Sequence, residues 1–260
     1  VDGVLLIHVS TALAYGRPDG RGLTASTAFD ETTPPGPAAS EYAASKQAGD
    51  SVAQEAFESG AVRGCTLFLA CCIGADPKLL DPQRDVMKLL PLVRGSIPAI
   101  IASPTIFTYV YVRDAAEAIV RAAELLLRAD ESESRRPARG DRFLIGDQRL
   151  STKDYYALIA ELSGQPAPRA EVPVWLALGA GKVSSFLATR LTGSNPTAPA
   201  DLVRTAAKGT LLFDASKSKR ELGMVYTDIR VAFAEAVDYV TAPPEVPPDH
   251  AEATERLVED

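Results

Sequence analysis

Histidine and cysteine are scarce in this chain, and their scarcity excludes several kinds of chemistry. There are two histidines, His8 in an apolar run and His250 in a tail rich in proline and glutamate. Any Ser-His-Asp triad or histidine-rich metal centre would have to use His8. The three cysteines, Cys65, Cys71 and Cys72, have no metal-ligand spacing, and an apolar run around the adjacent pair is typical of buried thiols. The sequence therefore argues against a hydrolase and predicts no metal site, and a reducing cytoplasm fits the free thiols.

The chain also lacks an excess of basic charge and any long hydrophobic run. Its net charge is −7, and no cluster of lysine and arginine offsets this acidity, so we expect neither a nucleic-acid partner nor an anionic membrane surface. No apolar run reaches the roughly 18 residues that a membrane span needs, and no signal peptide is visible. The 260 residues, 46% of them hydrophobic, are enough for one large or two modest domains.

The first half of the sequence predicts a strand, a helix and a second strand. Residues 4–9 form an apolar, β-branched run, and residues 17–40 are a loop rich in glycine and proline. A helix is expected over 41–59, with an apolar stripe formed by Val52, Ala53, Ala56 and Phe57. A second apolar strand is expected over 65–73. Such a unit places its two strands parallel, with ligands beyond their carboxyl ends, where Ser10, Thr11 and Gly74 stand.

The second half predicts shorter elements and a change of composition. Strands are expected near 97–101, 106–112, 142–145 and 210–213, and helices over 81–90, 114–128, 151–163, 174–191, 216–222 and 228–240, with Asp114 and Ser151 as caps. We expect a partial Rossmann-like catalytic domain over 1–147, to which 76–105 contribute part of a substrate region. A mainly helical substrate-binding region over 148–240 and a disordered tail over 241–260 complete the expected organisation.

Tyr42 and Lys46 lie one helical turn apart at the start of the first predicted helix, so their side chains share a face. A neighbouring ammonium favours the phenolate and lowers the pKa of a phenol. Lowering that pKa from ~10 to ~7 requires about 4 kcal/mol, since each pKa unit is roughly 1.4 kcal/mol. A charge at ~4 Å supplies about 1 kcal/mol in water and about 4 kcal/mol at an effective dielectric of ~20. The pair can therefore act as an acid/base catalyst only inside a partly closed cleft.

In its order of motifs the chain resembles the extended short-chain dehydrogenase/reductase family, which includes nucleotide-sugar epimerases and dehydratases, dihydroflavonol reductase-like enzymes and 3β-hydroxysteroid dehydrogenases. The strand-end Ser10-Thr11 with Tyr15-Gly16 is followed by Tyr42-Ala-Ala-Ser-Lys46 and then by the second apolar strand, which ends in Ile73-Gly74. A "V-x-V-x-D-x-A-x-A" block spans 110–118, and a "D-x-S-K-x-x-x-E-L-G" block spans 214–223. The resemblance implies the C-terminal part of a Rossmann-like, doubly wound parallel sheet.

The resemblance also implies an activity and a set of site residues. It implies an NAD(P)-dependent oxidoreductase or epimerase that passes a hydride between the nicotinamide of NAD or NADP and a secondary alcohol or ketone. Tyr42 would exchange a proton with the substrate oxygen, Thr11 would hydrogen-bond that oxygen, and Lys46 would hold the nicotinamide ribose. The cofactor contacts implied are Ser10, Tyr42, Lys46, Cys72 and Ile73. A homodimer through the helix that carries the pair is a further implication.

The chain departs from the family pattern in two places. No GxxGxxG turn, which binds pyrophosphate at a helix N-terminus, occurs in the sequence. Where relatives carry Arg-Pro, this chain has Phe68-Leu69, and Ala75 follows Gly74. We therefore expect roughly 100 further residues upstream in a parent protein, an apolar strand left unpaired at a sheet edge, and no activity of this chain alone. The alternative is a non-catalytic or truncated relative that binds a small molecule or a partner protein.

Overall fold

The computed structural model describes residues 4–16, 28–38, 40–76, 89–97, 99–102, 106–128, 140–168, 170–173, 175–176, 179 and 212–242. A three-stranded parallel sheet in the order β1-β2-β6 organises the first part of the chain. Its strands are β1 (Leu5–Thr11), β2 (Arg63–Leu69) and β6 (Asp141–Ile145). Strand β2 is buried along almost its whole length, as expected for the central strand of a sheet that helices cover on both faces.

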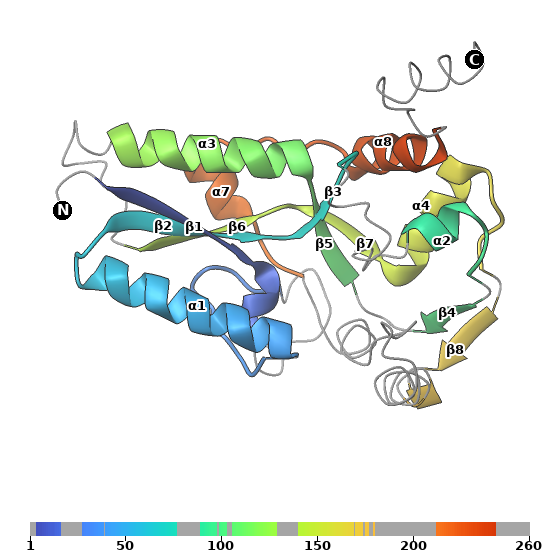
Figure 1. The fold of residues 1–260 in the computed structure, drawn as a ribbon, viewed down its shortest axis with the longest axis horizontal. Helices are drawn as coiled ribbons and strands as arrows, with labels where there is room; N and C mark the ends of the chain where they lie inside the picture. The colour runs from blue at the N-terminus through green and yellow to red at the C-terminus, as the bar shows by residue number, and fades with distance from the viewer. Residues whose placement is uncertain are drawn as a thin grey trace, which may run out of the picture.

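Two long helices cover opposite faces of this sheet. Helix α1 (Glu41–Glu58) links β1 to β2 and packs against both, and α3 (Val112–Arg128) packs against the same strands from the other side. Figure 1 shows α3 above the sheet and α1 below it. The predicted strand-helix-strand unit with parallel strands is confirmed.

The predicted strand over 65–73 is in fact two strands that belong to different sheets. After β2 the backbone N–H of Ala70 still donates to the carbonyl of Ile145, at 2.9 Å, and the chain then enters β3 (Cys71–Ile73). Strand β3 pairs in parallel with β5 (Ile106–Tyr111), which pairs antiparallel with β7 (Gln148–Ser151). One apolar run gives no local signal for such a change of partner, because strand pairing is set by residues far away in the sequence.

The remaining described elements are shorter and lie around both sheets. They are the 3₁₀ helix η1 (Ala12–Tyr15), α2 (Leu89–Val93), β4 (Ala99–Ala102), α4 (Thr152–Ser163), β8 (Ala170–Pro173), α7 (Ser216–Glu221) and α8 (Ile229–Thr241). Strands β4 and β8 pair with each other in parallel. Ser151 caps α4 as predicted, since its hydroxyl accepts from the Asp154 N–H. The predicted helices over 81–90 and 174–191 lie largely outside the described residues, as do the tail from 243 and residues 210 and 211 of the predicted 210–213 strand. Phe213 forms a parallel bridge with Phe29.

Two hydrophobic clusters form the core. One lies between the β1-β2-β6 sheet and its helices, around Leu67, Phe68, Phe143, Leu144 and Phe213. The other joins β5, α4 and α8 around Tyr109, Tyr155, Ile159 and Phe233, whose three aromatic rings lie 5.5–6.3 Å apart between centroids. The second cluster fixes the C-terminal helix α8 to the second sheet.

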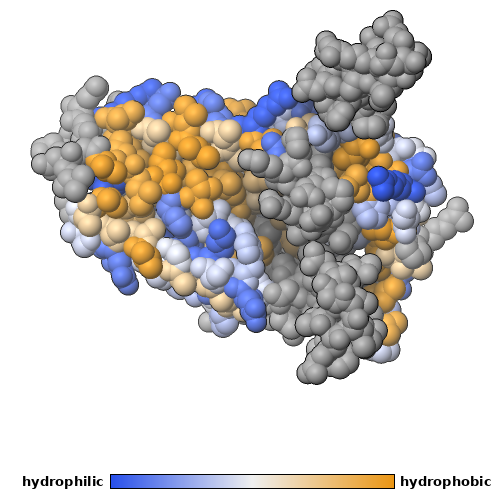
Figure 2. Space-filling view, viewed as in Figure 1, coloured by the Kyte–Doolittle hydropathy of each residue, from blue (hydrophilic) through white to orange (hydrophobic). Residues whose placement is uncertain are grey.

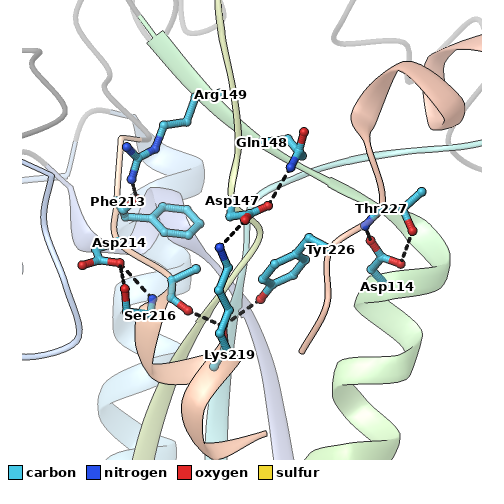
Figure 3. A network of polar contacts seen from close by, with 12 residues as sticks. Asp114, Asp147, Gln148, Arg149, Phe213, Asp214, Ser216, Lys219, Tyr226 and Thr227 are labelled. Carbon is cyan, nitrogen blue, oxygen red and sulfur yellow. Dashed lines mark hydrogen bonds and ion pairs between the residues drawn. The ribbon is translucent and has the colours of Figure 1, made fainter. Parts of the chain in front are cut away.

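A network of polar contacts holds the segment 212–228 to the ends of the strands (Figure 3). Lys219 pairs with Asp147, just after β6, and the Arg149 guanidinium donates to the carbonyl of Phe213 at 2.6 Å. Tyr226 shares a 2.7 Å hydrogen bond with Ser218. Residues of the late motif block therefore contribute to the packing of the fold.

Strand β1 forms an open edge of its sheet in the part of the chain that is described, as the sequence predicted. It pairs with β2 alone, and its apolar side chains stay exposed: Leu6 by 38% and Val9 by 40%. Figure 2 shows hydrophobic residues gathered on this end of the molecule, over β1 and part of α3, where Val120 and Leu127 are also exposed. No helix among the described residues combines the length and the apolar character required to cross a bilayer.

Candidate active site

The carboxyl end of β1 carries Ser10 and Thr11. Ser10 is 6% exposed, and its hydroxyl oxygen is buried without a hydrogen-bond partner among the described residues. The Thr11 hydroxyl accepts a hydrogen bond from the Leu13 N–H at 3.3 Å and so caps η1. The strand-end cap and the proposed catalytic role are compatible, because a hydroxyl that accepts one hydrogen bond can still donate its own proton.

The first turn of α1 presents Tyr42 and Lys46. Ser40 is the N-cap, with its hydroxyl accepting from the Ala43 N–H at 3.1 Å, so the helix begins at a defined residue just before the pair. Tyr42 is 51% exposed, and the Lys46 ammonium lies 5.7 Å from the centroid of its ring. The two side chains meet as the spacing predicted, with the cation over the ring face.

The pKa of Tyr42 does not move in the direction that the lysine was expected to impose. Partial burial raises the pKa of this phenol above 10.0, and the nearby thiols of Cys72 and Cys71 raise it further. An ammonium over the ring face stabilises the phenolate less than one beside the phenol oxygen would. Half of the Tyr42 side chain is also exposed to water, which weakens the attraction further. In this structure the pair therefore does not form the closed, activated arrangement that acid/base catalysis requires.

Strand β3 carries Cys71, Cys72 and Ile73. Ile73 is buried, and both thiols are shielded enough that burial raises their pKa from 9.0, to about 12 for Cys71 and about 11 for Cys72. Both thiols contribute to the raised pKa of the Tyr42 phenol. The strand thus lines the site with neutral, weakly polar groups.

The buried face of α1 carries polar residues that the sequence prediction missed. The predicted stripe included Val52, which is 67% exposed, whereas the buried positions are Ala43, Asp50, Ala53 and Phe57. Asp50 accepts a 2.8 Å hydrogen bond from His8 of β1, so the one histidine in an apolar strand serves to join strand and helix. An acidic residue among the apolar positions of the buried stripe was the available signal, since such a group requires a partner.

Gln47 is the second polar residue on this face. Its side-chain nitrogen donates to the carbonyls of Ala14, at 2.8 Å, and Gly36, at 2.9 Å. The structure therefore joins α1 both to the strand through His8 and Asp50 and to the loop after the strand through Gln47. Between Thr11 and Tyr42 themselves, no hydrogen bond exists within the described part of the chain.

The described strands and helices define a Rossmann-like α/β fold with a site at the carboxyl ends of parallel strands. Among solved structures, the chain is similar to gox2253, with a TM-score of 0.66 and 22% identity, over 90% of this chain and 65% of that one. It is also similar to UDP-glucuronic acid 4-epimerase from Bacillus cereus, solved with UDP-glucuronic acid and NAD, with a TM-score of 0.61 and 17% identity, over 92% of this chain and 62% of that one. These likenesses establish the fold.

The chain belongs to the NAD-dependent epimerase/dehydratase family, whose pattern residues 2–134 match. It is also 30% identical over 181 residues to sterol demethylase protein B from Methylococcus capsulatus, a match that covers 68% of this chain and 50% of that protein. The chain thus spans about half the length of this relative and less than two thirds of the two solved structures. The resemblance inferred from the motifs, to the extended short-chain dehydrogenase/reductases, is confirmed.

Proposed function

We propose that this chain supplies the catalytic portion of an NAD(P)-dependent oxidoreductase or epimerase that acts on a secondary alcohol or ketone. One observation carries the proposal: the start of α1 presents Tyr42 and Lys46 beside β3, while Gln47 and Asp50 fix the same helix to the strand that ends in Ser10 and Thr11. Membership of an NAD-dependent family supports the choice of cofactor. Sterol-like, flavonol-like and nucleotide-sugar substrates all fit this class.

The residues present suit the nicotinamide end of such a cofactor. The Ser10 hydroxyl is a buried polar group without a partner in the described chain, and a carboxamide or ribose hydroxyl would satisfy it. Lys46 would hold the ribose, with Cys72 and Ile73 forming an adjacent wall. The sequence offers no glycine-rich turn for the pyrophosphate, so the other end of the cofactor is not accommodated by residues of this chain. When bound, the cofactor supplies a hydride acceptor or donor.

The protein's own part in the reaction is to handle one proton. Tyr42 would donate its phenolic proton to a ketone oxygen in reduction, or accept the hydroxyl proton in oxidation, and Thr11 would hold that oxygen by a hydrogen bond. Acceptance requires the phenolate, which the raised pKa disfavours in the half-open site. If the site closed and moved the Lys46 ammonium from the ring face to the phenol oxygen, the pKa of Tyr42 would fall. The ammonium stabilises the phenolate more strongly in less polar surroundings.

A binding module without catalysis is the second candidate. It is favoured by the exposure of Tyr42, by the direction of its pKa, and by the missing pyrophosphate turn. In that case the exposed strand β1 and the site beside it would hold a partner or a small molecule without turning it over.

Turnover with and without the phenol distinguishes the candidates. With the N-terminal half that is expected upstream included, the protein is assayed for oxidation of NADH and NADPH with ketones and for reduction of NAD and NADP with secondary alcohols, and cofactor affinity is measured separately by fluorescence. Tyr42→Phe should lower turnover by about 10²–10⁴-fold, the usual contribution of a general acid/base, and leave cofactor affinity nearly unchanged. Equal turnover in the variant and the original would eliminate the assigned role. Tyr239→Phe, an exposed tyrosine on α8, is the matched control and should retain full turnover.

A further inference from the structure

The loop that follows Thr11 is held to the catalytic helix by one side chain. The Nε2 atom of Gln47 donates one hydrogen bond to the carbonyl of Ala14, at 2.8 Å, and one to the carbonyl of Gly36, at 2.9 Å. A primary amide has two N–H donors, so this geometry uses both. Gln47 directly follows Lys46 on α1, and the bridged carbonyls belong to two segments far from each other in the sequence.

The two bridged segments also bind each other closely. The N–H of Gly36 donates to the carbonyl of Tyr15 at 2.8 Å. Gly16 has φ +64°, and a Cβ at this position would lie 2.4 Å from the Gly36 oxygen. Only glycine fits there, both for its left-handed backbone and for the close approach. The segments around residues 14–16 and 36 therefore form a single tightly packed unit, and Gln47 attaches this unit to α1.

This unit continues to the Thr11 hydroxyl through short local bonds. The Leu13 N–H donates to Thr11 Oγ1 at 3.3 Å, and the Gly16 N–H donates to the Leu13 carbonyl at 3.0 Å. The short helix η1 is thus fixed at its start by Thr11 and at its end by Gly16. A shift of this unit against α1 would move the threonine hydroxyl relative to the tyrosine.

We propose that Gln47 is a positioning residue, which sets the place of Thr11 relative to Tyr42 and Lys46 by clamping η1 and the 35–37 segment to α1. The catalytic meaning of this clamp rests on the function proposed above. The proposed reaction needs two groups on one substrate oxygen, Thr11 at the end of β1 and Tyr42 on α1. A displacement of about 1 Å at such a site costs roughly a hundredfold in rate.

Substitution of Gln47 by methionine tests the clamp, because methionine fills a similar volume without an N–H donor. Gln54→Met is the matched control: it makes the same change two turns later on α1, where the side-chain nitrogen donates to Glu58 of the same helix instead of to the loop. Both variants are followed by amide hydrogen exchange, observed at Leu13 and Gly36, with Leu67 in the sheet core as the reference.

In Gln47→Met the Leu13 and Gly36 amides should exchange at least about tenfold faster, since two partly buried carbonyls lose their donor and tenfold corresponds to about 1.4 kcal/mol. The exchange rate at Leu67 should not change in either variant, and Gln54→Met should not change the exchange rate at any of the three amides. Turnover should fall roughly 10- to 100-fold in Gln47→Met with the KM for cofactor unchanged, because the lost interaction serves the placement of reacting groups.

The outcomes separate this proposal from the function on which it rests. Exchange at Leu13 and Gly36 that matches the original protein overturns the clamp, whatever the turnover. Faster exchange with unchanged kcat, in a protein that Tyr42→Phe inactivates, shows a merely structural contact and also overturns it. If the protein shows no turnover even with the N-terminal half that is expected upstream, the proposed function fails, and the exchange pattern alone then decides whether Gln47 holds Thr11 in place.

Discussion

Asp114 accepts two hydrogen bonds from Thr227, one from its backbone N–H at 2.7 Å and one from its hydroxyl at 2.9 Å (Figure 3). Asp114 was predicted to cap α3 at its N-terminus, and this prediction is wrong: the helix begins at Val112, so Asp114 lies within its first turn. The carboxylate joins the first turn of α3 to the segment that precedes α8. The motif block over 110–118 thus contacts the segment just after the block over 214–223, and its aspartate has a structural role.

Asp114→Asn should lower the free energy of unfolding by about 1.5–3 kcal/mol, the range for hydrogen bonds to a charged group. The amide keeps one acceptor and loses the charge that strengthens both bonds. Urea denaturation followed by circular dichroism measures the change. Thr227→Val, which keeps the backbone bond, should cost less, about 0.5–1.5 kcal/mol. Glu117→Gln on the exposed side of the same helix is the control, and an equal loss there would contradict the assigned contact.

The thiols beside Tyr42 should resist alkylation. Burial raises the pKa of Cys72 from 9.0 to about 11, so at neutral pH the folded protein holds about a hundredfold less thiolate than the unfolded chain. Iodoacetamide labelling, with peptide mass analysis, should proceed slowly in buffer and quickly in guanidinium. Because the folded pKa is the higher one, the contribution of Cys72 to stability is complete below pH 9 and is lost as the pH rises toward about 11. Rapid labelling of folded protein at neutral pH would contradict the burial.

The Tyr42 phenol should titrate above pH 10 in the protein without cofactor, because burial and the adjacent thiols favour the neutral form. The phenolate absorbance, with Tyr42→Phe subtracted, isolates this group from the other tyrosines. The direction of the pH dependence of catalysis follows from this titration. The rate of alcohol oxidation, which needs the phenolate, should rise with pH, and the rate of ketone reduction, which needs the phenol, should fall. A titration below pH 10 in the free protein would show that Lys46 already activates the tyrosine.

The open edge of β1 should cause self-association. Leu6 and Val9 are exposed apolar residues on a strand that, within the described residues, is paired on one side only, a combination that favours pairing with another chain. Leu6→Lys should raise the concentration at which light scattering detects association by about tenfold, since a buried leucine contributes roughly 1.5–3 kcal/mol. Val225→Lys, at an 85% exposed valine away from the sheet, is the matched control. If the two variants behave alike, the association does not involve β1.

The elements with strong local signals were predictable from the sequence. Helix α1 was expected over 41–59 and spans Glu41–Glu58, and the Ser151 cap was placed correctly because hydroxyl caps and helical periodicity act within a few residues. The edge position of β1 followed from the missing glycine-rich turn. The spacing of Tyr42 and Lys46 likewise fixed their meeting on one helix face.

The features that could not be predicted from the sequence depend on contacts between residues far apart in the chain. The division of 65–73 into β2 and β3 reflects the partners β6 and β5, which come much later in the chain. The contacts of Gln47 with Ala14 and Gly36 depend on how the loop folds back, and the raised pKa of Tyr42 depends on β3. A helical wheel shows Gln47 on the buried side, but it does not show which carbonyls lie opposite.

The open strand β1 has a thermodynamic consequence for the site. Ser10 and Thr11 terminate the strand that forms the free edge, so any segment that pairs with β1 also becomes a wall of the site beside them. Two equilibria are then coupled, occupancy of the edge and occupancy of the site. By linkage, each strengthens the other by the same factor, so a ligand in the site would stabilise the completed sheet as much as the completed sheet tightens the ligand.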